Sequence, residues 1–160
     1  MKNKLLSLLF ASFLVISGCE TIGGSSSSSD SPSYEYGDSK QANLQGYLQN
    51  EIGDRVYFET DKHNINSASA FTLESQANWL NSTPGFQIIV EGHCDERGTR
   101  EYNLALGERR ANSVKDYLMT YGISGNRISV ISYGKERPVD SGSNPLAWSK
   151  NRRSVTVKAN

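Results

Sequence analysis

The chain has 160 residues, which is enough for one folded domain of ordinary size. It carries 17 Lys and Arg side chains against 17 Asp and Glu, and loss of a targeting segment that holds Lys2 and Lys4 would leave 15 against 17, a net charge of −2. This balance excludes the strongly basic surface that nucleic acid binding requires. The two cysteines form no C-x-x-C motif, so the sequence supports neither a zinc ribbon nor a disulfide framework.

The first 18 residues have the composition of a bacterial export signal. A positively charged start precedes a short apolar run, Leu5–Ile16, which is too short to span a bilayer with ease. The run closes with Ile16-Ser17-Gly18-Cys19, which resembles a lipobox, where small residues admit a peptidase and the thiol receives diacylglycerol. We expect residues 1–18 to be removed and Cys19 to be lipidated; the alternative is an ordinary secretory signal that contains a cysteine. Among lipoproteins, Asp after the cysteine favours the inner membrane, so Glu20 implies the outer membrane.

Residues 19–45 are expected to form the lipidated N-terminus and a flexible linker. Gly23-Gly24 and the run Ser25–Ser29 lack the apolar side chains that a core needs. About 25 residues of this kind average roughly 25–30 Å end to end as a coil and reach about 80 Å when stretched. Such a tether lets the folded domain, residues 46–160, act at a distance from the lipid. Within this region, Gln41–Ile52 has weak helical character and is expected to be an ordered lead-in.

The first half of the domain predicts a strand, a helix and a second strand. The short strand is Arg55–Phe58, whose Tyr57 and Phe58 we expect in the core. Asn66 or Ser67 is placed to cap a helix that runs to about Asn81, and Pro84-Gly85 ends that unit. The apolar run Phe86–Val90 is then expected to be a buried strand.

The second half predicts a long helix and two strands. The helix covers Arg100–Tyr121 and is followed by a strand at Arg127–Ser132, a long loop with two prolines at Tyr133–Lys150, and an alternating strand at Ser154–Lys158. The order βαβαββ predicts an α+β fold, a two-layer sandwich with helices packed on one face of a small mixed sheet. Small side chains on the second helix would let it lie close to the sheet. Its predicted core stripe is Leu104, Gly107, Ala111, Val114, Leu118 and Tyr121.

The candidate binding site is the polar stretch between the second strand and the second helix. Asp95 lies in the loop, and Asn103 and Arg110, seven residues apart, share a helix face. A carboxylate and a guanidinium on one concave surface suit a zwitterionic ligand, because Arg grips a carboxylate with two parallel hydrogen bonds and Asp holds an ammonium. Asn103, Thr99 and the loop amides would add neutral hydrogen bonds. Neither charged residue lies on the core stripe, so the fold is expected to tolerate their removal.

Three other interpretations apply to this stretch. In the first, Asp95 and Arg110 form only a structural ion pair or are solvated like most charge runs. His93, Cys94, Asp95 and Glu96 resemble a metal set, but adjacent residues on extended chain point to alternate sides and do not converge on one ion. The same geometry disfavours Cys94 with His93 as nucleophile and base, so Cys94 is expected to be a small packed residue.

Several sequence blocks resemble the OmpA-like domain family, in particular its peptidoglycan-associated lipoproteins. The likeness covers roughly Asp54 to Val157 and includes Tyr57-Phe58 near its start. Two later blocks also match, Ser132-Tyr133-Gly134-Lys135-Glu136-Arg137-Pro138 and Ser149-Lys150-Asn151-Arg152-Arg153. The family pattern of loop and helix is matched by Asp95, Asn103, Leu106, Gly107, Arg110, Ala111 and Val114.

This resemblance implies a ligand and partners that composition does not reveal. The implied ligand is the peptidoglycan peptide stem that carries meso-diaminopimelate, whose free end is a zwitterion. The implied partners are TolB and other Tol proteins, in a system that keeps the outer membrane attached to the wall during division. Thr60 departs from the relatives, which often carry Phe there. Ligand roles carry over to Asp95, Arg110 and Asn103, and more loosely to Phe58, Asp61, Arg97, Thr99 and Leu106.

The favoured hypothesis is therefore a non-enzymatic binding module without cofactor or metal, lipid-anchored to the outer membrane and facing the periplasm. An enzyme acting on peptidoglycan is one alternative, but the sequence presents no zinc set, Ser/Lys or Cys/His arrangement, or paired acids that would support it. A lipid-anchored protein-interaction domain is the other alternative. Binding of a wall fragment at Asp95 and Arg110 would separate the favoured hypothesis from the second alternative.

Overall fold

The computed structural model describes residues 43–159, and the predicted signal peptide, Cys19 and most of the predicted linker lie outside this range. The described part of the chain begins with a short helical segment, and the last residues of that segment are η1 (Leu48–Ile52). Among the described residues, no helix has the length and apolar character needed to cross a membrane. The remaining elements are β1 (Arg55–Tyr57), α2 (Ser67–Ser82), β2 (Ile88–His93), α3 (Arg100–Thr120), η2 (Gly125–Arg127), β3 (Ile128–Gly134), α4 (Pro145–Asn151) and β4 (Arg153–Lys158).

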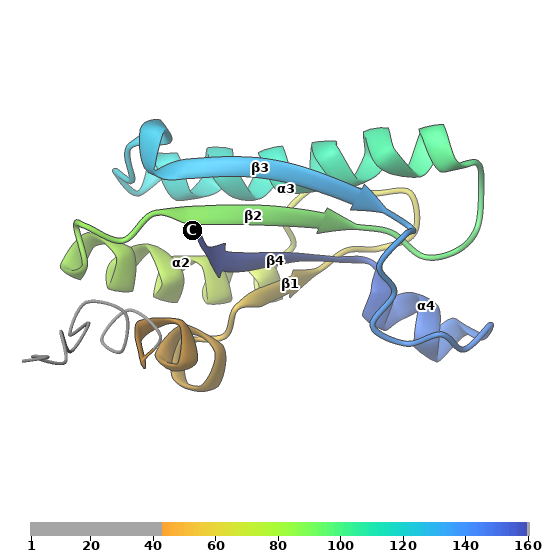
Figure 1. The fold of residues 1–160 in the computed structure, drawn as a ribbon, viewed down its shortest axis with the longest axis horizontal. Helices are drawn as coiled ribbons and strands as arrows, with labels where there is room; N and C mark the ends of the chain where they lie inside the picture. Colours follow the sequence, from red (N-terminus) through yellow and green to blue (C-terminus); the bar gives the residue numbers. More distant parts are fainter. Residues whose placement is uncertain (1–42, 160) are drawn as a thin grey trace, which may run out of the picture. The chain divides into compact units, whose positions relative to one another are not determined.

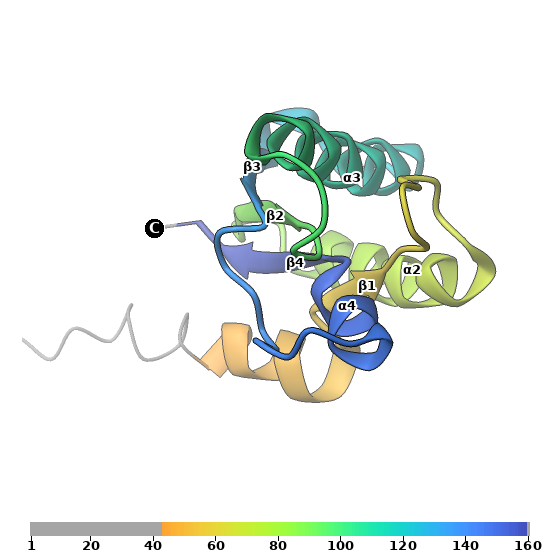
Figure 2. The same ribbon diagram turned by 90° about the vertical axis from the view of Figure 1, so that its right-hand side faces the viewer.

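The four strands form one mixed sheet in the order β1-β4-β2-β3. β2 and β3 are parallel, whereas β4 is antiparallel to both β1 and β2. Figures 1 and 2 show α2 and α3 side by side on one face of this sheet. The predicted α+β sandwich, with helices on one face of a small mixed sheet, is confirmed.

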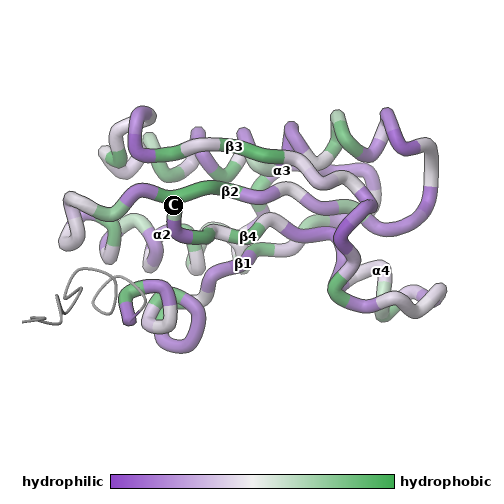
Figure 3. The backbone as a smooth tube through the Cα atoms, in the orientation of Figure 1, coloured by the Kyte–Doolittle hydropathy of each residue, from purple (hydrophilic) through white to green (hydrophobic). Residues whose placement is uncertain are grey.

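The core fills the space between the two helices and the sheet. Leu73 and Leu80 of α2 and Val114 and Leu118 of α3 are fully buried there. Figure 3 shows hydrophobic residues concentrated along β2 and β3, whereas the segment that joins β2 to α3 is hydrophilic. The regularly spaced apolar residues that predicted each helix thus lie mainly on the face that the helix buries.

Two predicted segments differ from the structure. β2 continues to His93, three residues past the predicted end, because pairing with β3 and β4 extends through Glu91 and Gly92, which we expected in a loop. The predicted loop before β4 contains α4. The Asn144 side chain caps α4 by accepting a hydrogen bond from Ala147 N at 3.0 Å, and Pro145 begins it. Proline at a first helical position favours a helix, because its missing N–H is not needed there.

Two predicted core positions are also wrong. Tyr57 is 45% exposed and Tyr121 is 37% exposed, whereas Phe58, and Trp79 of α2, are buried as predicted. Tyr57 points to the sheet face that the helices leave uncovered, since alternate strand residues face opposite sides and its neighbour Val56 is in the core. Tyr121 follows the end of α3 and stacks on Tyr117 at 5.3 Å.

Close approach of α3 to the sheet depends on a pair of glycines. A Cβ added to Gly92 of β2 would lie 1.9 Å from the carbonyl oxygen of Gly107 in α3. A Cβ added to Gly107 would lie 2.4 Å from Ser132 Oγ and 3.0 Å from Gly92 O. The prediction that a small residue at Gly107 brings the helix near the sheet is confirmed, and Gly92 is its partner.

This contact predicts a sharp difference between glycines. Gly92→Ala should destabilise the fold by about 3 kcal/mol or more, since backbone rather than a flexible side chain blocks the methyl group. Gly85→Ala is the matched control, because a Cβ there meets nothing within 4 Å. Chemical denaturation of both variants measures the difference; equal stability would contradict the close packing.

Candidate ligand-binding site

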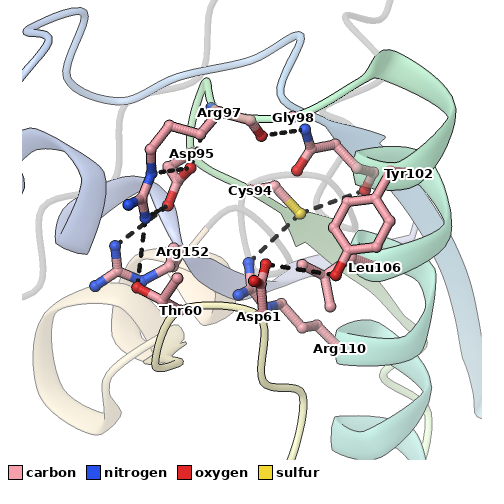
Figure 4. A pocket seen from close by; sticks show the side chains of 11 residues that line it. Thr60, Asp61, Cys94, Asp95, Arg97, Gly98, Tyr102, Leu106, Arg110 and Arg152 are labelled. Carbon is pink, nitrogen blue, oxygen red and sulfur yellow. Dashed lines mark hydrogen bonds and ion pairs between the residues drawn. The ribbon is translucent and has the colours of Figure 1, made fainter.

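A pocket opens where β2 ends and α3 begins. It has a volume of about 240 Å³ and is shaped by four segments, namely the loop after β1, the end of β2 with the following loop, α3, and the junction of α4 and β4. Figure 4 shows its side chains converging from these segments. The lining residues are Thr60, Asp61, Cys94, Asp95, Arg97, Gly98, Tyr102, Asn103, Leu106, Arg110 and Arg152.

Asp95 is held by two arginines other than Arg110. Its Oδ1 accepts from the backbone N and the Nε of Arg97, both at 3.1 Å, and its Oδ2 accepts from Arg97 Nη2 at 2.7 Å and Arg152 Nη1 at 3.3 Å. Burial alone would raise the pKa of Asp95, but the hydrogen bonds from Arg97 and Arg152 outweigh burial and lower that pKa. A carboxylate has about four acceptor positions, so the protein itself fills those of Asp95.

Arg110 is fully buried and joins three segments. Its Nε donates to Lys62 O at 2.9 Å, its Nη2 to Glu59 O at 3.1 Å, and its Nη1 to His93 O at 2.8 Å. Nη1 also lies 3.4 Å from Cys94 Sγ, so four of the five N–H groups are engaged. Burial lowers the pKa of Arg110, although a guanidinium stays charged in proteins.

These bonds correct two expectations. Asp95 and Arg110 line the same pocket, but within the described residues each has other partners, so they are not a structural ion pair. The reason for expecting the fold to tolerate loss of Arg110 is wrong, because this side chain is fully buried although it lies off the predicted core stripe. Removing its guanidinium would leave the buried carbonyl of His93 and the carbonyls of Glu59 and Lys62 without this donor. An unsatisfied buried group costs about 1–3 kcal/mol.

The predicted neutral groups mainly shape the loop. Asn103 Nδ2 donates to Arg97 O at 2.7 Å and to Thr99 O at 3.0 Å, which fixes the turn before α3. Thr99 is the N-cap of α3 and accepts from Tyr102 N at 3.2 Å; it does not line the pocket. Asn103 does line it, so of the two only Asn103 is placed to meet a ligand directly.

The more loosely expected residues divide between pocket and core. Asp61 and Leu106 line the pocket. Asp61 is exposed, has a positive φ of 54°, and accepts from Tyr102 Oη at 3.4 Å. Phe58 is buried behind the pocket, with the Arg110 Cζ 5.2 Å from its ring centre, and borders a neighbouring groove instead.

Sequence reasoning missed several lining residues. Tyr102 lies one helical turn before Leu106, so the shared helix face was a usable signal. Arg152 reaches the pocket from the junction of α4 and β4, 57 residues beyond Asp95, which no local pattern indicates. Thr60 accepts from Arg97 Nη2 at 3.4 Å, so the position that departs from the family pattern contacts a site residue.

The site offers no evident catalytic or metal chemistry. Within residues 43–159, no group of three or more His, Cys, Asp or Glu side chains could hold a metal ion. Burial raises the pKa of the Cys94 thiol, which disfavours the reactive thiolate. The His93 ring lies beside Tyr133, 5.5 Å between centres, and is not among the pocket residues.

Comparison with known proteins places the sequence and fold of this chain in a known class. The model of the OmpA family matches residues 57–152, and the chain belongs to that family. Within it, the chain belongs to the peptidoglycan-associated lipoproteins, as the sequence predicted.

The similar proteins support this assignment at different coverage. The peptidoglycan-associated lipoprotein of Mesorhizobium japonicum is 43% identical over 98% of this chain and 92% of its own length. That of Rhizobium meliloti is 54% identical over 66% of this chain, but the match spans only 60% of the relative. Among solved structures, the peptidoglycan-associated lipoprotein from Burkholderia pseudomallei is 37% identical with a TM-score of 0.66, covering 69% of this chain and 95% of that one. The C-terminal domain of Helicobacter pylori MotB is 26% identical with a TM-score of 0.62, covering 67% and 84%.

His93, directly behind the pocket, predicts a pH effect on stability. Burial and the nearby charges of Arg153 and Arg137 lower the pKa of His93 to about 3, so the 3.4 Å contact from its Nε2 to Glu91 involves a neutral ring. Between the ordinary value of about 6.5 and 3, the unfolded chain binds a proton that the folded chain does not, so stability falls as pH falls. At pH 5 this costs about 2 kcal/mol.

Replacing His93 should therefore flatten the acid branch of the stability profile. His93→Gln is expected to lose stability less steeply than the parent between pH 6.5 and 4.5, whatever its stability at pH 7. His63→Gln is the control, because His63 is exposed. Denaturant unfolding at several pH values measures the slopes, and parallel profiles for the parent and His93→Gln would refute the assignment.

Proposed function

We propose that the pocket binds the zwitterionic end of meso-diaminopimelate in the peptide stem of peptidoglycan. The observation that carries the proposal is the pocket's charge. Two carboxylates, Asp61 and Asp95, and three guanidinium groups, Arg97, Arg110 and Arg152, line one small cavity. A ligand with an ammonium and a carboxylate on one carbon meets both signs there, and charge-assisted hydrogen bonds are about twice as strong as neutral ones.

The hydrogen bonds within the pocket indicate which charged residue contacts the ligand ammonium and which contacts the ligand carboxylate. Asp61 is the carboxylate with open acceptor positions, so it receives the ammonium, while the negative charge of Asp95 adds attraction from behind. The ligand carboxylate accepts hydrogen bonds from the remaining N–H of Arg110, on the floor of the pocket. It also contacts the guanidinium groups of Arg97 and Arg152, which Asp95 holds at the rim. Asn103 and Leu106 complete the wall beside it.

The proposal extends to the whole protein. An outer-membrane lipoprotein anchored at Cys19 would hold the wall through this pocket, and the segment before the domain would serve as the tether. TolB and other Tol proteins are the proposed partners, with a role in envelope integrity and cell division. The relatives' names and the OmpA-like fold support wall association.

The ligand assignment predicts that binding affinity depends on the distal carboxylate of diaminopimelate. The full-length protein in detergent is titrated with a diaminopimelate-containing stem peptide and with the same peptide carrying lysine instead, which keeps the ammonium and lacks the distal carboxylate. The parent should bind the lysine peptide about 10- to 100-fold more weakly, the value of one charge-assisted hydrogen bond. Asp61→Asn and Asp95→Asn should weaken both peptides.

Arginine variants complete this test. Arg110→Lys should weaken only the diaminopimelate peptide, because a lysine ammonium cannot keep the bonds to three carbonyls and also donate to the ligand carboxylate. Loss of carbonyl partners should also lower the melting temperature of this variant. Melting curves for each variant separate lost binding from lost folding. If the parent binds both peptides equally well, the zwitterion assignment fails.

The anchor is tested by one substitution. Cys19→Ser should remove the thiol that carries the lipid, so labelled palmitate should not enter the protein and it should leave the membrane fraction. Cys94→Ser is the matched control, since Cys94 is buried in the folded domain. Normal palmitate incorporation in Cys19→Ser would refute the anchor.

A further inference from the structure

A second groove adjoins the proposed diaminopimelate pocket. It has a volume of about 370 Å³ and lies between the end of β1 and the α4–β4 junction. The two cavities share one lining residue, Arg152, and the adjacent residues Glu59 and Thr60 line one cavity each. A ligand that fills the first pocket and continues as a chain therefore passes Arg152 into this groove.

Arg152 has hydrogen-bonding capacity left for a ligand. Its Nε donates to Phe58 O at 3.0 Å and its Nη1 to Asp95 at 3.3 Å, which are two of its five N–H groups. No further protein acceptor is recorded for it within residues 43–159. Its side chain is only 14% exposed, so it is held in place between the cavities. Figure 4 shows its guanidinium beside Asp95 and Thr60, at the edge of the first pocket.

The charge of the groove favours an anion. Lys150 in the last turn of α4 is a second cation, and its 2.9 Å pair with Asp140 is half-exposed, so exchange for another anion costs little. The one acidic lining residue, Glu59, already pairs with Lys62. The hydroxyl of Ser149 and the exposed ring of Tyr57 supply a polar group and a flat wall.

We infer that this groove binds a second carboxylate of the same stem peptide, held by Arg152 and Lys150. The inference rests on the proposed function of the first pocket. Because the cavities share Arg152, the second carboxylate belongs to a residue next to diaminopimelate, since one extended residue spans about 3.5 Å. Two sources have this chemistry, namely the free α-carboxylate of a γ-linked glutamate before diaminopimelate and the terminal carboxylate of a residue after it.

The test compares peptides that differ only in one amide. The full-length protein in detergent is titrated with the diaminopimelate stem peptide, with its glutamyl α-carboxylate amidated, or with its terminal carboxylate amidated. One amidation should weaken binding about 3- to 10-fold, as expected for a half-exposed charged contact, and thereby identifies the source. If neither amidation weakens binding, the inference is overturned.

Variants tie that loss to the groove. Lys150→Ala should weaken the intact peptide about 3- to 10-fold and leave the relevant amidated peptide unchanged, and Lys150→Arg should restore the parent's behaviour. Lys115→Ala, on the distant half of α3, removes the same charge and should change neither peptide. Equal losses on intact and amidated peptides, or no loss in Lys150→Ala, overturn the inference.

Failure of the first pocket gives a different result. Asp61→Asn should weaken all three peptides, because it acts on the ammonium that they share. If Asp61→Asn binds all three like the parent, the proposed function fails, whereas a failure confined to Lys150→Ala and the amides leaves that function standing.

Discussion

The buried guanidinium of Arg110 is the interaction on which the site depends. One charged group on α3 joins the carbonyl of His93, at the end of β2, to those of Glu59 and Lys62 in the loop after β1. A buried charge is costly unless it is hydrogen-bonded, and four of the five N–H groups of Arg110 have protein partners. Three of the four segments that shape the pocket are therefore fixed relative to one another by the same residue that we propose as a ligand contact.

The glycine pair sets how near that guanidinium comes to the sheet. Because Gly92 and Gly107 allow β2 and α3 to touch backbone to backbone, Arg110, almost one turn further along α3, reaches the last carbonyl of the strand. A side chain at either glycine would push the helix outward and lengthen the hydrogen bond from Arg110 to His93. The packing of two residues without side chains thus determines the geometry of a charged site several ångströms away.

Sequence reasoning recovered what is local and missed what depends on long-range contact. Apolar periodicity located α2 and α3 nearly to the residue, because helices are specified by neighbours three and four positions apart. The polar end of β2 was read as loop, since its pairing with β4 is not encoded nearby. For the site, Asp95 and Arg110 followed from one stretch, whereas Arg152 and Thr60 came from segments that only the folded sheet brings together.

The least predictable feature is how the pocket's charges satisfy one another. The residues predicted from the sequence included two acids, Asp61 and Asp95, and two arginines, Arg97 and Arg110, and the prediction was that Asp95 and Arg110 contact the ligand directly. Unpaired charges are costly in a partly buried site. Asp95 is therefore paired with Arg97 and Arg152, and Arg110 donates its hydrogen bonds to backbone carbonyls. What remains open is the carboxylate of Asp61 at the rim and the outer N–H groups of Arg152. The buried charges of Asp95 and Arg110 therefore mainly hold other charged side chains and backbone segments in position, and those side chains recognise the ligand. Arg152, a residue outside the helix motif, is one of them, and it also links the pocket to the neighbouring groove.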